Sequence, residues 1–340
     1  MHTALEREHL GGTLAPFSGV PGAAVLNPSD LALVKLGQDL KKRGYQFTTI
    51  TPASHDRVNA RPAKPQTSLA DIFGWSHIFA AAHISAQDLA RLATAGALEF
   101  IGAAYRSSVR FSTLGDQLFA HSAFPTEQSD AVFFGPDTYR FIRFIQQSWG
   151  TMKHAPSRRL RVLDVGTGSG AAGLQMASFV AAKGGGLVTL SDINRRALRF
   201  SRINAAINDV RDVAIIESDL FANIDGDYDL IVANPPYLVD PLARVYRHGG
   251  GKLGFELSIR IVEEGVSRLS PGGRLLLYTG SAIVNGTDVF REALLSCLAS
   301  RRVRLAYEEI DPDVFGEELE HPPYDRVDRI AAVGITIDRV

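Results

Sequence analysis

The sequence is poor in thiols, in net charge and in long apolar runs, and each shortage excludes a class of protein. Cys297 is the single cysteine among 340 residues, which excludes an internal disulfide and a zinc site built from several thiolates. Lysine and arginine number 36 against 37 acidic residues, so the net charge of −1 argues against a polyanion held by bulk charge, although a local patch stays compatible. No run approaches the roughly 18 apolar residues that cross a membrane.

Targeting and metal-binding patterns are also lacking. Residues 1–10 hold Glu6, Arg7 and Glu8 and no apolar core, which is unlike a signal peptide, so a cytoplasmic location is expected. His121 has no second histidine or acid at ligand spacing, so no metal site is expected. The hydrophobic fraction of 45% and the charged fraction of 21% are typical of an ordinary globular protein.

The length suits roughly two domains. We expect a flexible arm rich in glycine, alanine and proline (1–27), an N-terminal substrate-recognition domain (28–124) and a catalytic domain (125–340). Residues 41–64 carry six basic side chains against one acid, which indicates either a solvated face or a contact surface for an acidic partner.

The N-terminal domain has a helical pattern followed by an alternating one. Helices are expected at 31–43 and from Ser85 to near Gly96, and residues 107–112 and 117–122 alternate like the strands of a hairpin. A helix followed by a hairpin resembles the end of a winged-helix domain. The hairpin is equally suited to joining the two domains, and the sequence leaves both interpretations open.

The catalytic domain alternates strand and helix patterns, which predicts a Rossmann-like α/β fold with a mostly parallel, seven-stranded sheet and helices on both faces. The last two predicted strands follow each other without a helix and are expected to form an antiparallel pair. The expected strands are 160–165, 186–191, 212–216, 228–233, 272–278, 302–309 and 328–337, and the expected helices are 139–149, 170–183, 194–207, 255–268 and 287–299.

A glycine-rich turn follows the first of these strands and opens a helix. Glycine there permits unusual φ angles and lets a ligand approach the backbone without a Cβ in the way, so the turn predicts a cofactor site. The predicted cofactor-binding residues of the turn are Asp164, Gly166, Thr167, Gly168, Ser169 and Gly170.

Two further acids follow the next two strands. Asp192 can accept both hydroxyls of a ribose, and Asp219, followed by Leu220, can accept from an adenine amino group, although each also suits plain helix or loop capping. Both S-adenosylmethionine and NAD fit such a pattern. Residues 168–173 satisfy G-x-G-x-x-G, but the match begins two residues after Gly166, and NAD leaves the next motif unexplained.

That motif is Asn234-Pro235-Pro236-Tyr237, directly after the strand 228–233. Two prolines forbid strand continuation, so a polar and an aromatic side chain lie on a stiff corner at the carboxyl end of a buried strand, where open α/β sheets bind ligands. The Asn234 amide oxygen and the Pro235 carbonyl can each accept an N–H, and Tyr237 can stack on a planar group. These four residues are the predicted catalytic group.

In that order, the glycine turn, Asp192, Asp219 and the Asn-Pro-Pro-Tyr corner resemble the class I S-adenosylmethionine-dependent methyltransferases. More narrowly, they resemble the small-domain N-methyltransferases typified by the HemK/PrmC release-factor glutamine methyltransferases, over residues 125–340. The resemblance implies one reversed edge strand and S-adenosyl-L-methionine as the cofactor. It places the methionine end at Gly166 to Gly170, the ribose at Asp192 and the adenine at Asp219.

The sequence departs from that family at two places. Residues 134–138 lack the arginine of the Pro-Arg-Pro-Glu-Thr segment, and the N-terminal region does not resemble the family's helical bundle. Two local patterns are interpreted as non-catalytic. His321-Pro322-Pro323-Tyr324 is expected to be a surface turn, and residues 248–251 are expected to form a flexible segment over the acceptor site, closing onto the helix 255–268.

The expected function is methyl transfer to a planar amide or exocyclic amino nitrogen of a macromolecule, either an RNA or DNA base or a protein glutamine. The winged-helix pattern and the basic stretch favour nucleic acid, whereas the neutral net charge does not. The alternatives are a small-molecule methyltransferase, an NAD-binding oxidoreductase, and a non-catalytic module with a methyltransferase fold. Neither a membrane nor a metal is expected as a partner.

Overall fold

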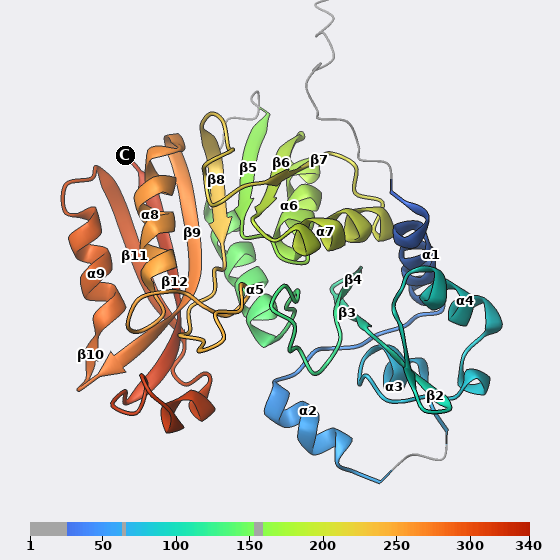
Figure 1. Cartoon of the computed structure of the whole chain (residues 1–340). Coiled ribbons are helices and arrows are strands. Elements are labelled where there is room, and N and C mark those ends of the chain that lie inside the picture. Colours follow the sequence, from blue (N-terminus) through green and yellow to red (C-terminus); the bar gives the residue numbers. More distant parts are fainter. Residues whose placement is uncertain (1–25, 63–65, 153–158) are drawn as a thin grey trace, which may run out of the picture.

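The computed structural model describes residues 26–62, 66–152 and 159–340, and in it an α/β half with a central sheet packs beside a smaller N-terminal part (Figure 1). The arm expected at 1–27 lies, except for its last two residues, outside the described residues. No helix in the described part of the chain is long and apolar enough to cross a membrane.

The central sheet has the strand order β11-β12-β9-β8-β5-β6-β7, and a two-residue strand, β10, pairs with β9. The four inner pairings of β5 to β9 are parallel. The predicted mostly parallel sheet is therefore confirmed. Its strands are β5 (Leu160–Val165), β6 (Gly186–Asp192), β7 (Val213–Glu217), β8 (Tyr228–Ala233), β9 (Leu269–Val284), β10 (Thr287–Asp288), β11 (Val303–Asp311) and β12 (Arg329–Arg339).

The reversed strand does not lie at the edge of the sheet. β12 is antiparallel both to β9 and to β11, so it lies between two strands that run in the same direction. The expected terminal antiparallel pair is confirmed, but the expectation of a reversed edge strand is wrong. The chain places its last strand inside the sheet because residues 330–335 of β12 are apolar and buried, whereas alternate residues of β11 are exposed.

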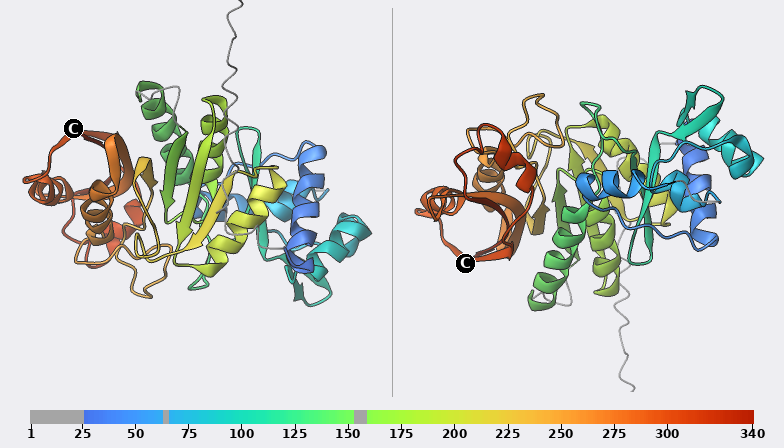
Figure 2. Two further views of the ribbon diagram at one scale, coloured as in Figure 1. Left: turned by 90° about the horizontal axis from the view of Figure 1, so that it is seen from above. Right: turned by 90° about the horizontal axis from the view of Figure 1, so that it is seen from below.

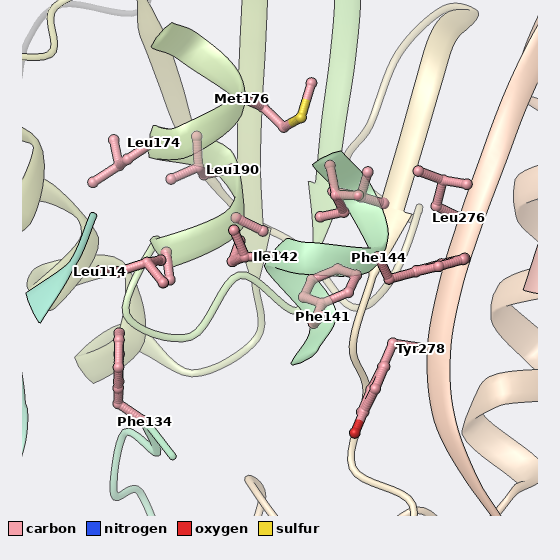
Figure 3. Close-up of a cluster of buried hydrophobic side chains, with 14 of the residues drawn as sticks. Leu114, Phe134, Phe141, Ile142, Phe144, Leu174, Met176, Leu190, Leu276 and Tyr278 are labelled. Atoms are coloured by element: carbon pink, nitrogen blue, oxygen red, sulfur yellow. The ribbon is translucent and has the colours of Figure 1, made fainter. Parts of the chain in front are cut away.

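Helices cover both faces because successive strand residues point in opposite directions. Leu230 and Val232 of β8 belong to the cluster beneath α5 (Pro136–Thr151) and α6 (Ala171–Ala182). Figure 3 shows this cluster, with Phe141 and Phe144 of α5 beside Leu276 and Tyr278 of β9. The alternating residues of β8 pack on the opposite face, against α8 (Glu256–Ser267) and α9 (Val289–Leu298).

The N-terminal part contains more elements than the sequence predicted. The expected helices correspond to α1 (Pro28–Lys42) and α4 (Ala86–Thr94), and the expected hairpin to β3 (Val109–Leu114) and β4 (Gln117–Ser122). A second hairpin directly follows α4, and Phe79 adds a single bridge to Tyr105 within it. The unpredicted elements are α2 (Pro52–Asn59), α3 (Leu69–Phe73), β1 (Leu98–Ile101) and β2 (Ala104–Ser107).

The β3–β4 hairpin is fixed to the catalytic half through α7 (Arg195–Ile207) and the residue that follows it. The Asn204 amide accepts from Ala120 N at 2.7 Å and donates to Ala120 O at 2.9 Å, and Asn208 makes the same pair of bonds with Leu118. Phe200 and Ile203 of α7 are buried in the same cluster as α1 and α3. The two parts therefore share one hydrophobic core.

Candidate functional site

A cleft of about 370 Å³ opens at the carboxyl ends of the parallel strands, which form the lower edge of the sheet in Figure 1. Such edges are the usual ligand sites of open α/β sheets. The cleft brings together every predicted site residue except Gly170, namely Asp164, Gly166, Thr167, Gly168, Ser169, Asp192, Asp219, Leu220, Asn234, Pro235, Pro236 and Tyr237.

The glycine turn has the backbone conformation that requires glycine. Gly166 has φ +68° and Gly168 has φ +57°, both in the left-handed region that other residues rarely adopt. A Cβ at either position would meet no atom within 4 Å, so the space beside the turn is open. Gly170 lies just behind it as the N-terminal cap of α6, where a Cβ would approach Ser201 Oγ at 3.1 Å.

Asp164 holds this turn from inside. Its Oδ2 atom accepts from the Thr167 hydroxyl at 2.5 Å and from Gly173 N at 2.8 Å, and the side chain is buried. Burial raises the pKa of Asp164 to about 6, while the two hydrogen bonds act in the opposite direction. The carboxyl group therefore fixes the loop that faces the cleft.

Asp192 is oriented by the backbone on two sides. One carboxylate oxygen accepts from Gly168 N at 2.9 Å and the other from Asn194 N at 2.8 Å, so the capping interpretation and a cleft-facing position coexist. Burial raises the pKa of Asp192, opposed by these backbone hydrogen bonds. Asp219 is different, because its side chain is 59% exposed and lies 4.0 Å from Arg260.

The Asn-Pro-Pro-Tyr corner lies beside the glycine turn, because Val165 and Ala233, which precede them, are paired on the neighbouring parallel strands β5 and β8. Asn234 is half-buried and Pro235 is buried. Among residues 26–62, 66–152 and 159–340, the Asn234 side chain has no hydrogen-bond partner, so its amide oxygen is available to a ligand.

Tyr237 is held more firmly than the sequence indicated. Its hydroxyl donates to Asp137 Oδ2 at 2.6 Å, and the Tyr278 hydroxyl and Arg140 Nη1 contact Asp137 Oδ1 at 2.9 and 3.1 Å. Burial and the Asp137 carboxylate raise the pKa of Tyr237 well above its usual value. A Cβ at Gly280 would lie 2.2 Å from the ring, so a glycine leaves room for it. The ring is positioned, and its stacking on an acceptor stays a prediction.

Sequence reasoning missed several residues of this cleft. Asp137 lies in the segment 134–138 that served above only as a departure from the family, and an acid in the first turn of α5 was the available signal. Phe315, whose ring centroid lies 5.8 Å from that of Tyr237, carries no sequence signal, because it comes from a loop between β11 and β12.

The segment after Tyr237 closes one side of the cleft. Gly249 N donates to Leu238 O at 2.8 Å, and a Cβ at Gly249 would lie 1.8 Å from Gly254 O, so this backbone is tightly packed. The Tyr324 hydroxyl accepts from Val239 N at 3.0 Å and donates to Leu253 O at 3.3 Å. The surface turn expected at 321–324 is thus corrected for Tyr324, which is 2% exposed because it anchors this segment.

Comparisons with known proteins agree with this geometry. Residues 150–297 match the family model described as "Methyltransferase small domain". The chain is 38% identical over 130 residues to a release factor glutamine methyltransferase of Deinococcus radiodurans, covering 34% of this chain and 44% of that protein. It is 34% identical over 127 residues to a putative protein N5-glutamine methyltransferase of Methanocaldococcus jannaschii, covering 35% of this chain and 61% of that protein.

RNA-modifying enzymes are similar as well. A ribosomal RNA small subunit methyltransferase C of Erwinia tasmaniensis is 29% identical over 126 residues, covering 37% of this chain and 33% of that protein. The crystal structure of a 16S rRNA N2 G1207 methyltransferase of T. thermophilus covers 71% of this chain and 57% of its own, with 17% identity and a TM-score of 0.43. The chain spans less than two thirds of the length of each of these proteins.

The matched segment contains the glycine turn, Asp192, Asp219 and the Asn-Pro-Pro-Tyr corner, which are the residues that carried the resemblance to HemK/PrmC enzymes. Residues 150–297 are therefore similar to the methyltransferase small domain.

Proposed function

We propose that this protein is an S-adenosyl-L-methionine-dependent N-methyltransferase whose acceptor is a planar amide or exocyclic amino nitrogen of a macromolecule. The observation that carries the proposal is that one cleft contains both the open glycine turn and the free Asn234 amide. A cofactor site alone fits many enzymes, whereas a carbonyl-rich corner beside it suits an N–H₂ acceptor.

The described residues fit this cofactor. The volume of about 370 Å³ lies within the range of small-molecule sites. Gly166 and Gly168, with open space beside them, would receive the methionine end, the oriented Asp192 carboxylate would accept from the ribose hydroxyls, and Asp219 with Leu220 would hold the adenine end. When bound, S-adenosylmethionine would supply an electrophilic methyl group on a sulfonium sulfur.

The Asn-Pro corner would orient the acceptor. Amide and exocyclic nitrogens are poor nucleophiles because their lone pair is delocalised into the π system. The Asn234 side-chain oxygen and the Pro235 carbonyl would each accept one N–H and direct the lone pair at the methyl group. Catalysis would then rest on positioning and electrostatics, and no strong base is required before attack.

Two acceptor classes fit this corner. The names of the similar proteins include a release factor, a ribosomal protein and ribosomal RNA as acceptors, so both a protein glutamine and a nucleic-acid base are compatible. The segment 134–138 lacks the arginine of the glutamine methyltransferases, and the N-terminal part differs from theirs. Incubating the protein with radiolabelled S-adenosylmethionine and separated RNA, DNA and protein fractions identifies the labelled class.

Asn234→Ala tests the assignment of the corner. We expect loss of methyl transfer to the labelled fraction, while the affinity for S-adenosylmethionine in calorimetry stays within about tenfold, or about 1.4 kcal/mol. Asp192→Ala is the matched control, since it should weaken cofactor binding directly. Equal loss of binding and transfer in Asn234→Ala, or retention of NAD in place of S-adenosylmethionine, would overturn the proposal.

A further inference from the structure

A second polar site lies outside the cleft, around Arg110 of β3. This side chain is 4% exposed, and its guanidinium lies 5.4 Å from the centroid of the Phe47 ring. Within the described part of the chain, Arg110 Nε and Nη2 have no hydrogen-bond partner, and no carboxylate pairs with the side chain. A buried cation without a counter-charge is costly, and such groups are rare in folded proteins.

The groups around Arg110 are polar but uncharged. His121, its cross-strand neighbour, contacts the Ser112 hydroxyl at 2.8 Å, and that hydroxyl lies 2.5 Å from the Thr49 hydroxyl. Burial, with a smaller contribution from the charge on Arg110, lowers the pKa of His121 well below its usual value. These groups satisfy one another, because His121 Nδ1 also contacts Ser122 O at 3.0 Å. The unused donors of the site therefore belong to Arg110, which carries one full positive charge with nothing negative beside it among the described residues.

The two free nitrogens are the ones suited to an oxyanion. Nε and Nη2 lie on one edge of the planar guanidinium, and their parallel N–H groups match two oxygens of a phosphate or a carboxylate. His55 does not add a donor, because its Nε2 donates to Trp75 O at 2.9 Å and leaves the buried Nδ1, which has no partner among the described residues, as an acceptor.

The site adjoins the cleft through the start of α5. Phe134 stacks on His121 with centroids 5.1 Å apart, while the preceding residue, Phe133, lines the cleft. In the same way, the Tyr139 hydroxyl contacts Thr49 N at 3.2 Å, and the preceding residue, Thr138, lines the cleft. The start of α5 therefore lies between the cleft and the Arg110 region.

The helix α2 lies beside this region, since the charge on Arg110 acts on its His55, whose ring also contacts those of Trp75 and Phe124. His55 is its one buried residue, and its hydrogen bonds to the body join His55 and Asn59 to Trp75 and His77. Figure 2 (right) shows α2, in blue, crossing the side of the molecule that is seen from below. Arg57 and Arg61, on α2 and just after it, are exposed and form no ion pair with a described residue.

We propose that the Nε–Nη2 edge of Arg110 binds one phosphate group, which enters when α2 moves aside. The exposed Arg57 and Arg61 favour phosphate over a carboxylate, because they add positive charge along the entry side. This site does not depend on the methyl-transfer reaction, so it can be tested on the protein without cofactor.

The test measures binding of radiolabelled inorganic phosphate by equilibrium dialysis, together with thermal unfolding in phosphate and in sodium chloride at equal ionic strength. We expect wild-type protein to bind phosphate and to melt at a higher temperature in phosphate. Arg110→Met should lower the phosphate affinity at least about tenfold. Arg304→Met, which removes an exposed arginine of β11, is the control and should behave as wild type.

Arg110→Lys keeps the charge without the two-donor edge, and it decides the matter if Arg110→Met does not fold. It should also lose most of the phosphate affinity. Equal phosphate binding by wild type and the Arg110 variants would overturn the proposal, and so would an absence of binding by wild type. Stabilisation by acetate but not by phosphate would overturn the assignment of phosphate.

Discussion

Two buried side chains of opposite charge, Asp137 and Arg110, lie near the start of α5, and their surroundings differ. Asp137, in the first turn of α5, receives the hydroxyls of Tyr237 and Tyr278 and pairs with Arg140. Arg110, close to Tyr139 of the next half-turn, has two nitrogens with no partner in the described part of the chain. The Asp137 carboxylate therefore has partners on both oxygens, whereas the Arg110 guanidinium keeps two N–H groups without acceptors among the described residues.

The difference in hydrogen bonding indicates that Asp137 has a structural role, whereas Arg110 is available to bind a ligand. A buried charge that already has its hydrogen bonds stabilises and orients its neighbours, and it has little left to offer a ligand. A buried charge without partners destabilises the free protein, and it retains its full capacity for a ligand of opposite sign. Mutation should therefore change stability in opposite directions at the two sites.

The largest effect is expected for Asp137→Ala. This variant leaves the two tyrosine hydroxyls and Arg140 without their shared acceptor, so the free energy of unfolding should fall by about 3–5 kcal/mol. Urea denaturation measures it. Asp311→Asn, which removes the more exposed partner of Arg140, is the control, with an expected loss of up to about 1 kcal/mol. Equal losses for the two variants would contradict a scaffold role for Asp137.

Arg110→Met should change stability in the other direction. Replacing an uncompensated buried cation by an apolar side chain of similar length is expected to raise the free energy of unfolding by about 1–4 kcal/mol in buffers without phosphate. The same urea titration measures the gain. A loss of stability would show that Arg110 is itself part of the scaffold, and the comparison with Asp137 would fail.

Tyr237→Phe sharpens the assignment at the corner. It removes one hydroxyl from the Asp137 carboxylate and keeps the ring, so the expected loss is about 1.5–3 kcal/mol, as for a hydrogen bond to a charged group. Because the ring remains available to the acceptor, the Michaelis constant for the acceptor should change less than in Tyr237→Ala. Initial-rate kinetics at saturating cofactor compare the two variants.

The last prediction concerns acid. Burial, aided by the charge on Arg110, lowers the pKa of His55 from 6.5 to about 4. Because the folded-state pKa lies below the unfolded value, the stabilisation from neutral His55 is complete above about pH 6.5 and is lost as the pH falls towards 4. His55→Gln should flatten the unfolding free energy between these pH values, whereas His321→Gln, on the surface, should not. An unchanged slope in His55→Gln would contradict the burial of this imidazole.

The sequence predicted the catalytic half well because its signals are local. β5 and β8 begin and end where the apolar runs do, since a glycine turn stops one and two prolines stop the other. The helix α2 gave no such signal, because a single histidine is its only buried residue and no apolar stripe marks it. The β1–β2 hairpin was missed because its strands are four residues long and mostly half-exposed.

The candidate site divides in the same way. The glycine turn and the Asn-Pro-Pro-Tyr corner were predictable, since backbone chemistry fixes both and the parallel sheet brings strand ends together. The contact between Tyr237 and Asp137 spans 100 positions, and no local pattern could have indicated it. The unpaired charge on Arg110 was not predictable either, because the alternation of a strand indicates which residues are buried and does not indicate their hydrogen-bond partners.

The pairing of Asn204 and Asn208 with β4 has a consequence for dissecting this chain. A shortened protein that starts near residue 125 would keep every residue of the cleft, but it would lack the N-terminal residues that bury Phe200 and Ile203 of α7. The Asn204 and Asn208 amides would then be exposed to water beside an exposed apolar patch on α7. Such a fragment should aggregate or require detergent. Acceptor selection and methyl transfer are therefore better separated by point substitutions than by truncation.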